Sequence, residues 1–186
     1  MSTAIDLTEH LISSETIVTG GMLTVKRDQV RLSNGNCAQR EYIVHPGAVV
    51  VVAMLTNGHV ILERQFRYPL RQVFIELPAG KIDAGESVLH TGHRELLEET
   101  GYSANKWIKL GLLHPCIGYS DEVIHIYLAQ DLYAGEHKRD DDELLEVLNT
   151  SIEDCLKMID NGEITDAKTI IALFFAHNYL IKHGLK

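Results

Sequence analysis

The pattern of apolar and polar positions divides the chain into a polar N-terminal part and a longer part rich in apolar runs. In the first part the alternation predicts strands over Thr16–Val25, Gln29–Leu32 and Gln39–Val44, with a turn at Ser33–Asn36. These strands would form a small antiparallel sheet, which ends at the Pro-Gly pair of residues 46 and 47. We therefore expect an N-terminal β arm over residues 1–45 and a main domain over residues 46–186.

The main domain is predicted to mix strands and helices. Ala48–Leu55 is almost entirely apolar and rich in valine, which is typical of a strand buried on both faces. Other strands are predicted over His59–Gln65, Val73–Leu77, Lys106–Leu113, Val123–Leu132 and Leu144–Leu148. Helices are predicted over Ser87–Thr100, Ser151–Asp160 and Ala167–His183, the first capped by Ser87 and ended by Gly101. This order predicts an α/β sandwich with a mixed sheet.

Composition and charge exclude several classes of protein. The chain has 186 residues, with 17 Lys and Arg against 26 Asp and Glu, and a net charge of −9. This charge argues against general binding of nucleic acid. Three cysteines lie far apart without a CxxC pair, so neither a zinc site nor a disulfide framework is indicated. The N-terminus does not resemble a signal peptide, and no apolar run would span a bilayer. We expect a cytoplasmic protein without a membrane partner.

The segment from Gly80 to Tyr102 carries the candidate chemistry. Three carboxylates at spacing i, i+3 and i+4 would share one helix face: Glu95, Glu98 and Glu99. They repel one another unless a cation lies between them, and hard divalent cations such as Mg²⁺ prefer oxygen ligands. Glu86 adds a fourth carboxylate in the preceding loop, and Arg94 can reach Glu98 or that loop. The alternative is a solvated acidic helix face.

The same segment resembles the signature of the Nudix hydrolases. That signature reads Gly, five residues, Glu, seven residues, then Arg-Glu-aliphatic-any-Glu-Glu-any-Gly-aliphatic. The positions in register are Gly80, Glu86, Arg94, Glu95, Glu98, Glu99 and Gly101. Leu96 fills the first aliphatic position, whereas Tyr102 stands at the last. A chance match to seven fixed residues at fixed spacing is much less probable than a chance match to a short glycine motif. The resemblance implies an α/β/α sandwich that hydrolyses a nucleoside diphosphate linked to another moiety, using Mg²⁺ or Mn²⁺.

The resemblance also implies roles for single residues. Glu95 and Glu99 would bind metal, with the Ala79 carbonyl and Glu98 as further ligands. Glu98 and Glu86 would also assist catalysis, and Arg94 would hold carboxylates in place. Metal ions neutralise the diphosphate and lower the pKa of a bound water, whose proton a carboxylate then takes. In the acidic loop 138–143, Glu143 is the first choice for this base and Asp141 the second; the alternative is a loop that is merely exposed.

Further stretches resemble the ADP-ribose pyrophosphatases within that family. They are Arg40–Val49, Glu63–Tyr68, Glu76–Gly80, Ser120–Glu122 and Ile164–Thr169. By this resemblance Arg67 contacts the substrate, Arg40 and Glu76 are further candidates for substrate binding, and the N-terminal arm forms a swapped homodimer. The expected reaction converts ADP-ribose and water to AMP and ribose 5-phosphate.

Two alternatives remain open. Ile117 stands where the subfamily usually has a proline, which leaves room for another nucleoside diphosphate derivative, such as a nucleotide sugar. A non-catalytic sensor of ADP-ribose is the second alternative, although the complete set of carboxylates favours catalysis. Outside the motif, Phe174 and Phe175 are expected in the core, and Trp107 is expected to serve packing.

Overall fold

The computed structural model describes residues 5–135 and 144–184 and divides into two compact units. One unit contains the chain up to His45 together with residues 116–122, and the other contains residues 46–115 and 123 onward. No helix within the described ranges is both long and apolar enough to cross a bilayer.

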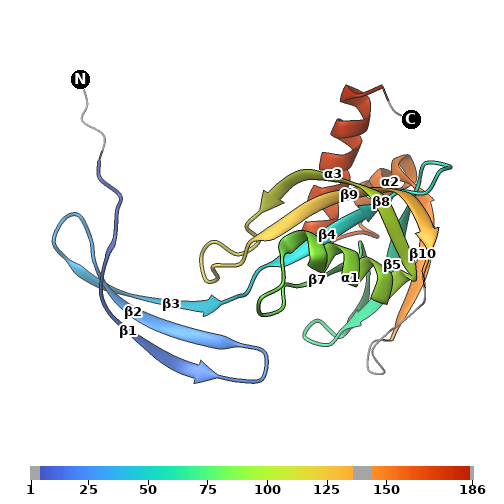
Figure 1. The fold of residues 1–186 in the computed structure, drawn as a ribbon. Coiled ribbons are helices and arrows are strands. Elements are labelled where there is room, and N and C mark those ends of the chain that lie inside the picture. The colour runs from blue at the N-terminus through green and yellow to red at the C-terminus, as the bar shows by residue number, and fades with distance from the viewer. Residues whose placement is uncertain (1–4, 136–143, 185–186) are drawn as a thin grey trace. The chain divides into compact units, whose positions relative to one another are not determined.

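The first unit is a three-stranded antiparallel sheet, in the order β1-β2-β3 (Figure 1). Its strands are β1 (His10–Thr19), β2 (Thr24–Arg31) and β3 (Cys37–Val44). The single strand expected over Thr16–Val25 is wrong, because a turn at Gly20 divides it. The Gly20 amide donates to the Leu23 carbonyl at 2.8 Å, and the two halves of the expected strand pair with each other.

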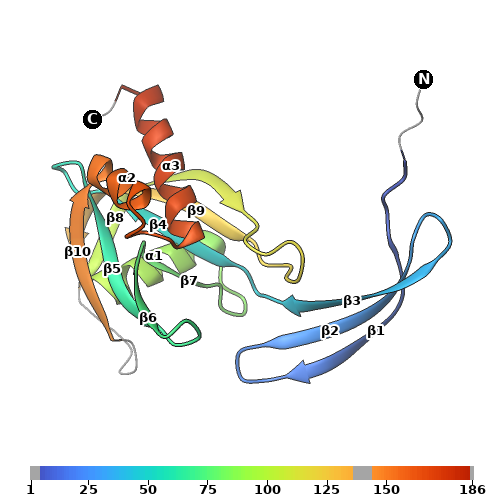
Figure 2. The ribbon, with the colours of Figure 1, turned by 180° about the vertical axis from the view of Figure 1, so that it is seen from behind.

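The second unit contains the remaining elements of the chain (Figures 1 and 2). Its strands are β4 (Ala48–Ala53), β5 (His59–Arg67), β6 (Gln72–Glu76), β7 (Ala79–Lys81), β8 (Tyr102–Leu113), β9 (Ile124–Ala134) and β10 (Leu145–Ser151). Its helices are α1 (Val88–Thr100), α2 (Ile152–Asp160) and α3 (Ala167–Lys182). The strands form a mixed sheet, β7-β4-β9-β8, and an antiparallel sheet, β10-β5-β6. In the mixed sheet β4 runs parallel to β9, whereas the other neighbours are antiparallel.

Strand β4 lies at the centre of this unit, and all six of its residues are buried. Val50 and Val52 belong to the core on the side of α2 and α3. Val49 and Val51 belong to a second core with Leu96 of α1. Helices therefore cover both faces of the mixed sheet, which confirms the expected α/β/α sandwich (Figure 2).

The helix ends follow the sequence closely, but one core assignment does not. Ser87 caps α1 by accepting the His90 amide, and Gly101 ends it with φ 74°. Phe174 and Phe175 are 44% and 40% exposed, so placing them in the core was wrong. The buried side of α3 consists of Thr169, Ala172, Leu173, Ala176 and Leu180. With a period of 3.6 residues, positions 174 and 175 lie outside that stripe.

Candidate active site

Helix α1 presents its glutamates in two different environments. Glu95 and Glu99 are almost fully buried, at 8% and 2% exposure, whereas the Glu98 side chain is 35% exposed. The spacing places all three on adjoining parts of one face, but Glu95 and Glu99 turn toward the mixed sheet. Burying two carboxylates on neighbouring turns is costly unless other groups compensate their charge. These two positions are therefore unlike an ordinary solvated acidic face.

The short strand β7 receives both buried carboxylates. The Ala79 amide donates to Glu99 Oε2 at 2.9 Å. At Gly80 a Cβ atom would lie 1.8 Å from Glu95 Oε1, so the Glu95 carboxylate rests directly against the glycine backbone. Strand β7 is itself held by β4, where Val49 and Val50 pair with Gly80 and Ala79. A side chain at position 80 would displace the Glu95 carboxylate from this place.

Arg94 connects the carboxylates of the motif. Its Nε and Nη2 donate to the two oxygens of Glu86 at 3.1 and 3.0 Å. Its Nη1 donates to Glu98 Oε2 at 3.0 Å and lies 2.8 Å from Glu95 Oε1. The Arg94 hydrogen bonds hold the pKa of Glu86 far below its usual range, and Glu86 in turn raises the pKa of Arg94. The Arg94 guanidinium thus pairs with three carboxylates of the motif, so the cluster keeps an excess of negative charge.

The donor set fits a hard divalent cation. Carboxylates in excess over cations, two of them buried beside the β7 backbone, provide the oxygen ligands that Mg²⁺ and Mn²⁺ prefer. Among residues 5–135 and 144–184, no three His, Cys, Asp or Glu side chains surround a common point closely enough to hold a metal as they stand. Glu95 contacts Arg94, and Glu99 accepts the Ala79 amide. We expect these carboxylates to exchange such contacts when a cation binds.

A second charged group lies at the end of β6. Arg67 donates to the two oxygens of Glu76 through Nε and Nη2, at 2.7 and 2.8 Å. Lys168, at the start of α3, also contacts Glu76. Burial raises the pKa of Glu76, but Arg67 and Lys168 outweigh that effect and leave it below the usual value. Sequence reasoning missed Lys168, although it lies in the noted stretch Ile164–Thr169.

The structure does not place the remaining predicted residues relative to this site. Arg40 lies in the first unit, where it makes a two-pronged ion pair with Glu9 at 2.6 and 2.9 Å. Glu143 and its alternative Asp141 fall outside the described residues. The predicted site residues that the structure places within the second unit are those of the motif, Ala79, Arg67 and Glu76.

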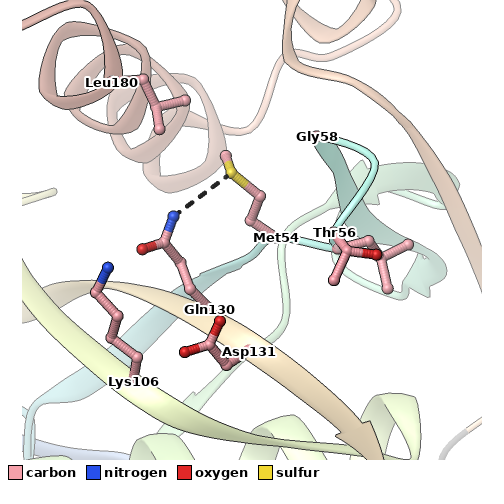
Figure 3. A pocket seen from close by; sticks show the side chains of 8 residues that line it. Met54, Thr56, Gly58, Lys106, Gln130, Asp131 and Leu180 are labelled. Atoms are coloured by element: carbon pink, nitrogen blue, oxygen red, sulfur yellow. Dashed lines mark hydrogen bonds between the residues drawn. The ribbon is translucent and has the colours of Figure 1, made fainter. Parts of the chain in front are cut away.

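A separate cavity of about 210 Å³ opens beyond the end of β4 and contains none of the predicted site residues. Its lining includes Met54, Lys106, Gln130, Asp131 and Leu180. Figure 3 shows the Gln130 amide nitrogen facing the Met54 sulfur, 3.9 Å away. We assign no role to it in the proposed chemistry.

Trp107 of β8 packs against His93 of α1, as expected from the sequence for the tryptophan. Their ring centroids are 4.2 Å apart, and Trp107 Nε1 donates to the Ala104 carbonyl at 3.1 Å. Burial lowers the pKa of His93. The pair lies close to Gly92 of α1, so it supports the helix that carries the glutamates.

Comparison with known proteins bears on this geometry. The chain is 41% identical to an ADP-ribose pyrophosphatase of Bacillus subtilis (strain 168), over 90% of this chain and 91% of that protein. It is 36% identical to a methanol dehydrogenase activator of Bacillus methanolicus, over 89% and 90% of the two chains. A crystal structure of an ADP compounds hydrolase superposes with a TM-score of 0.88 at 27% identity, covering 98% and 99% of the chains. Residues 44–173 match the NUDIX domain model, and the chain therefore belongs to the Nudix hydrolase family.

Proposed function

We propose that this chain hydrolyses the diphosphate of ADP-ribose, giving AMP and ribose 5-phosphate. The observation that carries the proposal is the burial of Glu95 and Glu99 against the β7 backbone, with Arg94 joining the remaining carboxylates of the motif. The ADP-ribose pyrophosphatase of Bacillus subtilis, similar over nine tenths of both chains, supports this substrate.

Glu95, Glu99 and the Ala79 backbone are the residues that would hold Mg²⁺ or Mn²⁺, with Glu98 as a further ligand. When bound, the cation supplies neutralisation of the diphosphate and a water of lowered pKa. The residues of the chain hold these carboxylates in position. Ala79 orients Glu99 through its amide, and Arg94 fixes Glu98 and Glu86.

The reaction needs an attacking water and a base. The oxygen of water adds to one phosphorus, the bond from that phosphorus to the bridging oxygen breaks, and two phosphate products leave. We propose that Glu143 is the base that accepts the proton of the water, with Asp141 as the alternative. Glu98 is the carboxylate of the described cluster that reaches solvent most, so it is suited to assist.

Arg67 is proposed to bind the diphosphate. Its Nε and Nη2 are engaged by Glu76, while its Nη1 makes no hydrogen bond within the described parts of the chain. A guanidinium held in this way presents a directed donor to a phosphate oxygen. Arg40 remains a proposed substrate contact. Because the net charge is −9, we do not propose nucleic acid as a partner, and we propose a cytoplasmic location.

The function is tested by Mg²⁺-dependent release of AMP from ADP-ribose, measured beside a panel of nucleotide sugars such as GDP-mannose. We expect ADP-ribose to have the highest kcat/KM of the panel and EDTA to abolish turnover. Faster turnover of a nucleotide sugar would keep the metal-dependent chemistry and contradict the substrate. Binding of ADP-ribose without turnover of any compound would favour a sensor.

We also propose that the N-terminal arm forms a homodimer. Among the strands that the structure describes, β1 pairs with β2 alone, and apolar side chains are exposed on β1 and on the turn that follows. They are Leu11, Ile12, Val18, Met22 and Leu23. An open strand edge with exposed apolar groups favours pairing with another chain. Analytical ultracentrifugation should give a species near twice 20.8 kDa; a monomer at micromolar concentration would contradict this proposal.

A further inference from the structure

The start of α3 is tied to the end of β6 by two side chains, Lys168 and Thr169. Asp166 caps the helix by accepting the Thr169 amide at 3.0 Å, and Lys168 Nζ lies 3.0 Å from the same Asp166 oxygen. The fully buried Thr169 hydroxyl accepts the Leu77 amide at 2.9 Å. The stretch Ile164–Thr169 therefore holds Glu76 and Leu77 in place. These residues lie shortly before Ala79, whose amide orients Glu99.

Glu76 occupies the centre of this connection, and both of its oxygens accept hydrogen bonds from cations. Its side chain is only 3% exposed. Oε1 accepts from Arg67 Nε, and Oε2 accepts from both Arg67 Nη2 and Lys168 Nζ. A buried carboxylate between two cations acts most directly on those cations. This geometry suggests that Glu76 influences substrate binding through Arg67 and not by touching the substrate itself.

Arg67 connects this network to the glutamates of α1. Its side chain is 41% exposed, in contrast to the 15% of Lys168, so its outer part reaches solvent. The hydrogen bonds to Glu76 chiefly raise its pKa, and the negative charges of Glu63 and Glu99 contribute as well. Arg67 therefore lies within electrostatic reach of Glu99, one of the proposed metal ligands.

We propose that Lys168 is a positioning residue for Arg67 and acts through Glu76. The inference rests on the proposed function, in which Arg67 binds the diphosphate. Lys168 fixes the Glu76 carboxylate to the well-anchored start of α3, and Glu76 in turn fixes two of the three Arg67 nitrogens. Without Lys168, Glu76 and Arg67 are held only by each other, and the pair can move together. The Nη1 donor then loses its direction, which weakens binding even though Arg67 is still present.

A double-mutant cycle tests this proposal. Lys168→Met, Arg67→Met and the double variant are compared for KM and kcat with ADP-ribose at saturating Mg²⁺. Lys168→Met should raise KM roughly tenfold with little change in kcat. In the Arg67→Met background the same replacement should leave KM unchanged, because the effects of neighbours that act as one unit are not additive. Lys168→Arg should restore most of the lost affinity, because it keeps the cation beside Glu76.

Lys157→Met provides a matched control. Lys157 is an exposed lysine that pairs with Asp154 of α2 at 2.6 Å and has no contact with Glu76. This variant should have the KM of the wild type. Two outcomes would overturn the proposal: an equal rise in KM for Lys168→Met in both backgrounds, or a wild-type KM in Lys168→Met. The first indicates that Lys168 acts independently of Arg67, and the second that Lys168 only supports the fold.

A measurement without substrate separates this proposal from the proposed function. In NMR relaxation of the free protein, the Arg67 Nε–H group should have a lower order parameter in Lys168→Met than in the wild type and in Lys157→Met, because the Glu76–Arg67 pair then moves together. An unchanged order parameter would overturn the positioning role. If the wild type fails to hydrolyse ADP-ribose, the substrate is wrong, while the order parameter still decides the role of Lys168.

Discussion

Replacing Glu99 with glutamine should lower kcat for diphosphate hydrolysis on the order of 10³-fold, because a metal ligand supplies several kcal/mol to the transition state. Glutamine has nearly the same shape, and its amide oxygen can still accept the Ala79 amide that now donates to Glu99 Oε2. It lacks the negative charge that holds a divalent cation. The variant should therefore stay folded and lose chemistry.

The measurement is Mg²⁺-dependent release of AMP, together with urea denaturation of each variant. Glu146→Gln is the matched control, because Glu146 is an exposed glutamate of β10 that pairs with Arg64 at 2.8 Å. This control should keep wild-type activity, since exposed ion pairs contribute little. A Glu99→Gln enzyme with kcat near that of the wild type would show that Glu99 is not a metal ligand.

Gly80→Ala should reduce kcat/KM about 100-fold, since a displacement of about 1 Å at a catalytic group has effects of this size. The new Cβ would lie 1.8 Å from Glu95 Oε1 and 2.4 Å from Oε2. The carboxylate is the end of a flexible side chain, so it can move aside while the backbone stays in place. The fold should survive at a cost of about 1–3 kcal/mol, as for other overpacked sites.

Gly111→Ala separates the loss of this carboxylate position from overpacking as such. There the new Cβ would lie 2.7 Å from the Phe175 ring, which is 40% exposed and can turn toward solvent. We expect a loss of stability no greater than that of Gly80→Ala, without loss of activity. Circular dichroism and the AMP assay suffice for both variants. Wild-type activity in Gly80→Ala would mean that Glu95 does not need its present position.

The sequence was most informative where a local signal decides the structure. Ser87 and Gly101 predicted both ends of α1, because capping depends on a few neighbouring atoms. The sequence did not predict the turn at Gly20 and Gly21, because apolar residues with strand propensity continue on both sides of it. The division of the strands between two sheets also escaped prediction, since pairing partners far apart in the chain leave no local pattern.

The candidate site shows the same limit. The motif spacing indicated a glutamate cluster with Arg94 inside it, and the structure brings these residues together. Spacing could not reveal that Glu95 and Glu99 are buried while Glu98 is not, because burial depends on the strand that packs against the helix. Nor could it pair Glu76 with Lys168, which is 92 residues away.

The buried strand β4 has a consequence for the growing chain on the ribosome. Six apolar residues emerge early, but the parallel partner β9 begins only at Ile124, which faces Ala48. Until about 75 further residues have been made, one edge of β4 has no partner, and the face that α2 and α3 cover stays open for longer still. During this interval Ala48–Ala53 is an exposed apolar segment that favours aggregation. We expect a chaperone that binds short apolar strands to bind there.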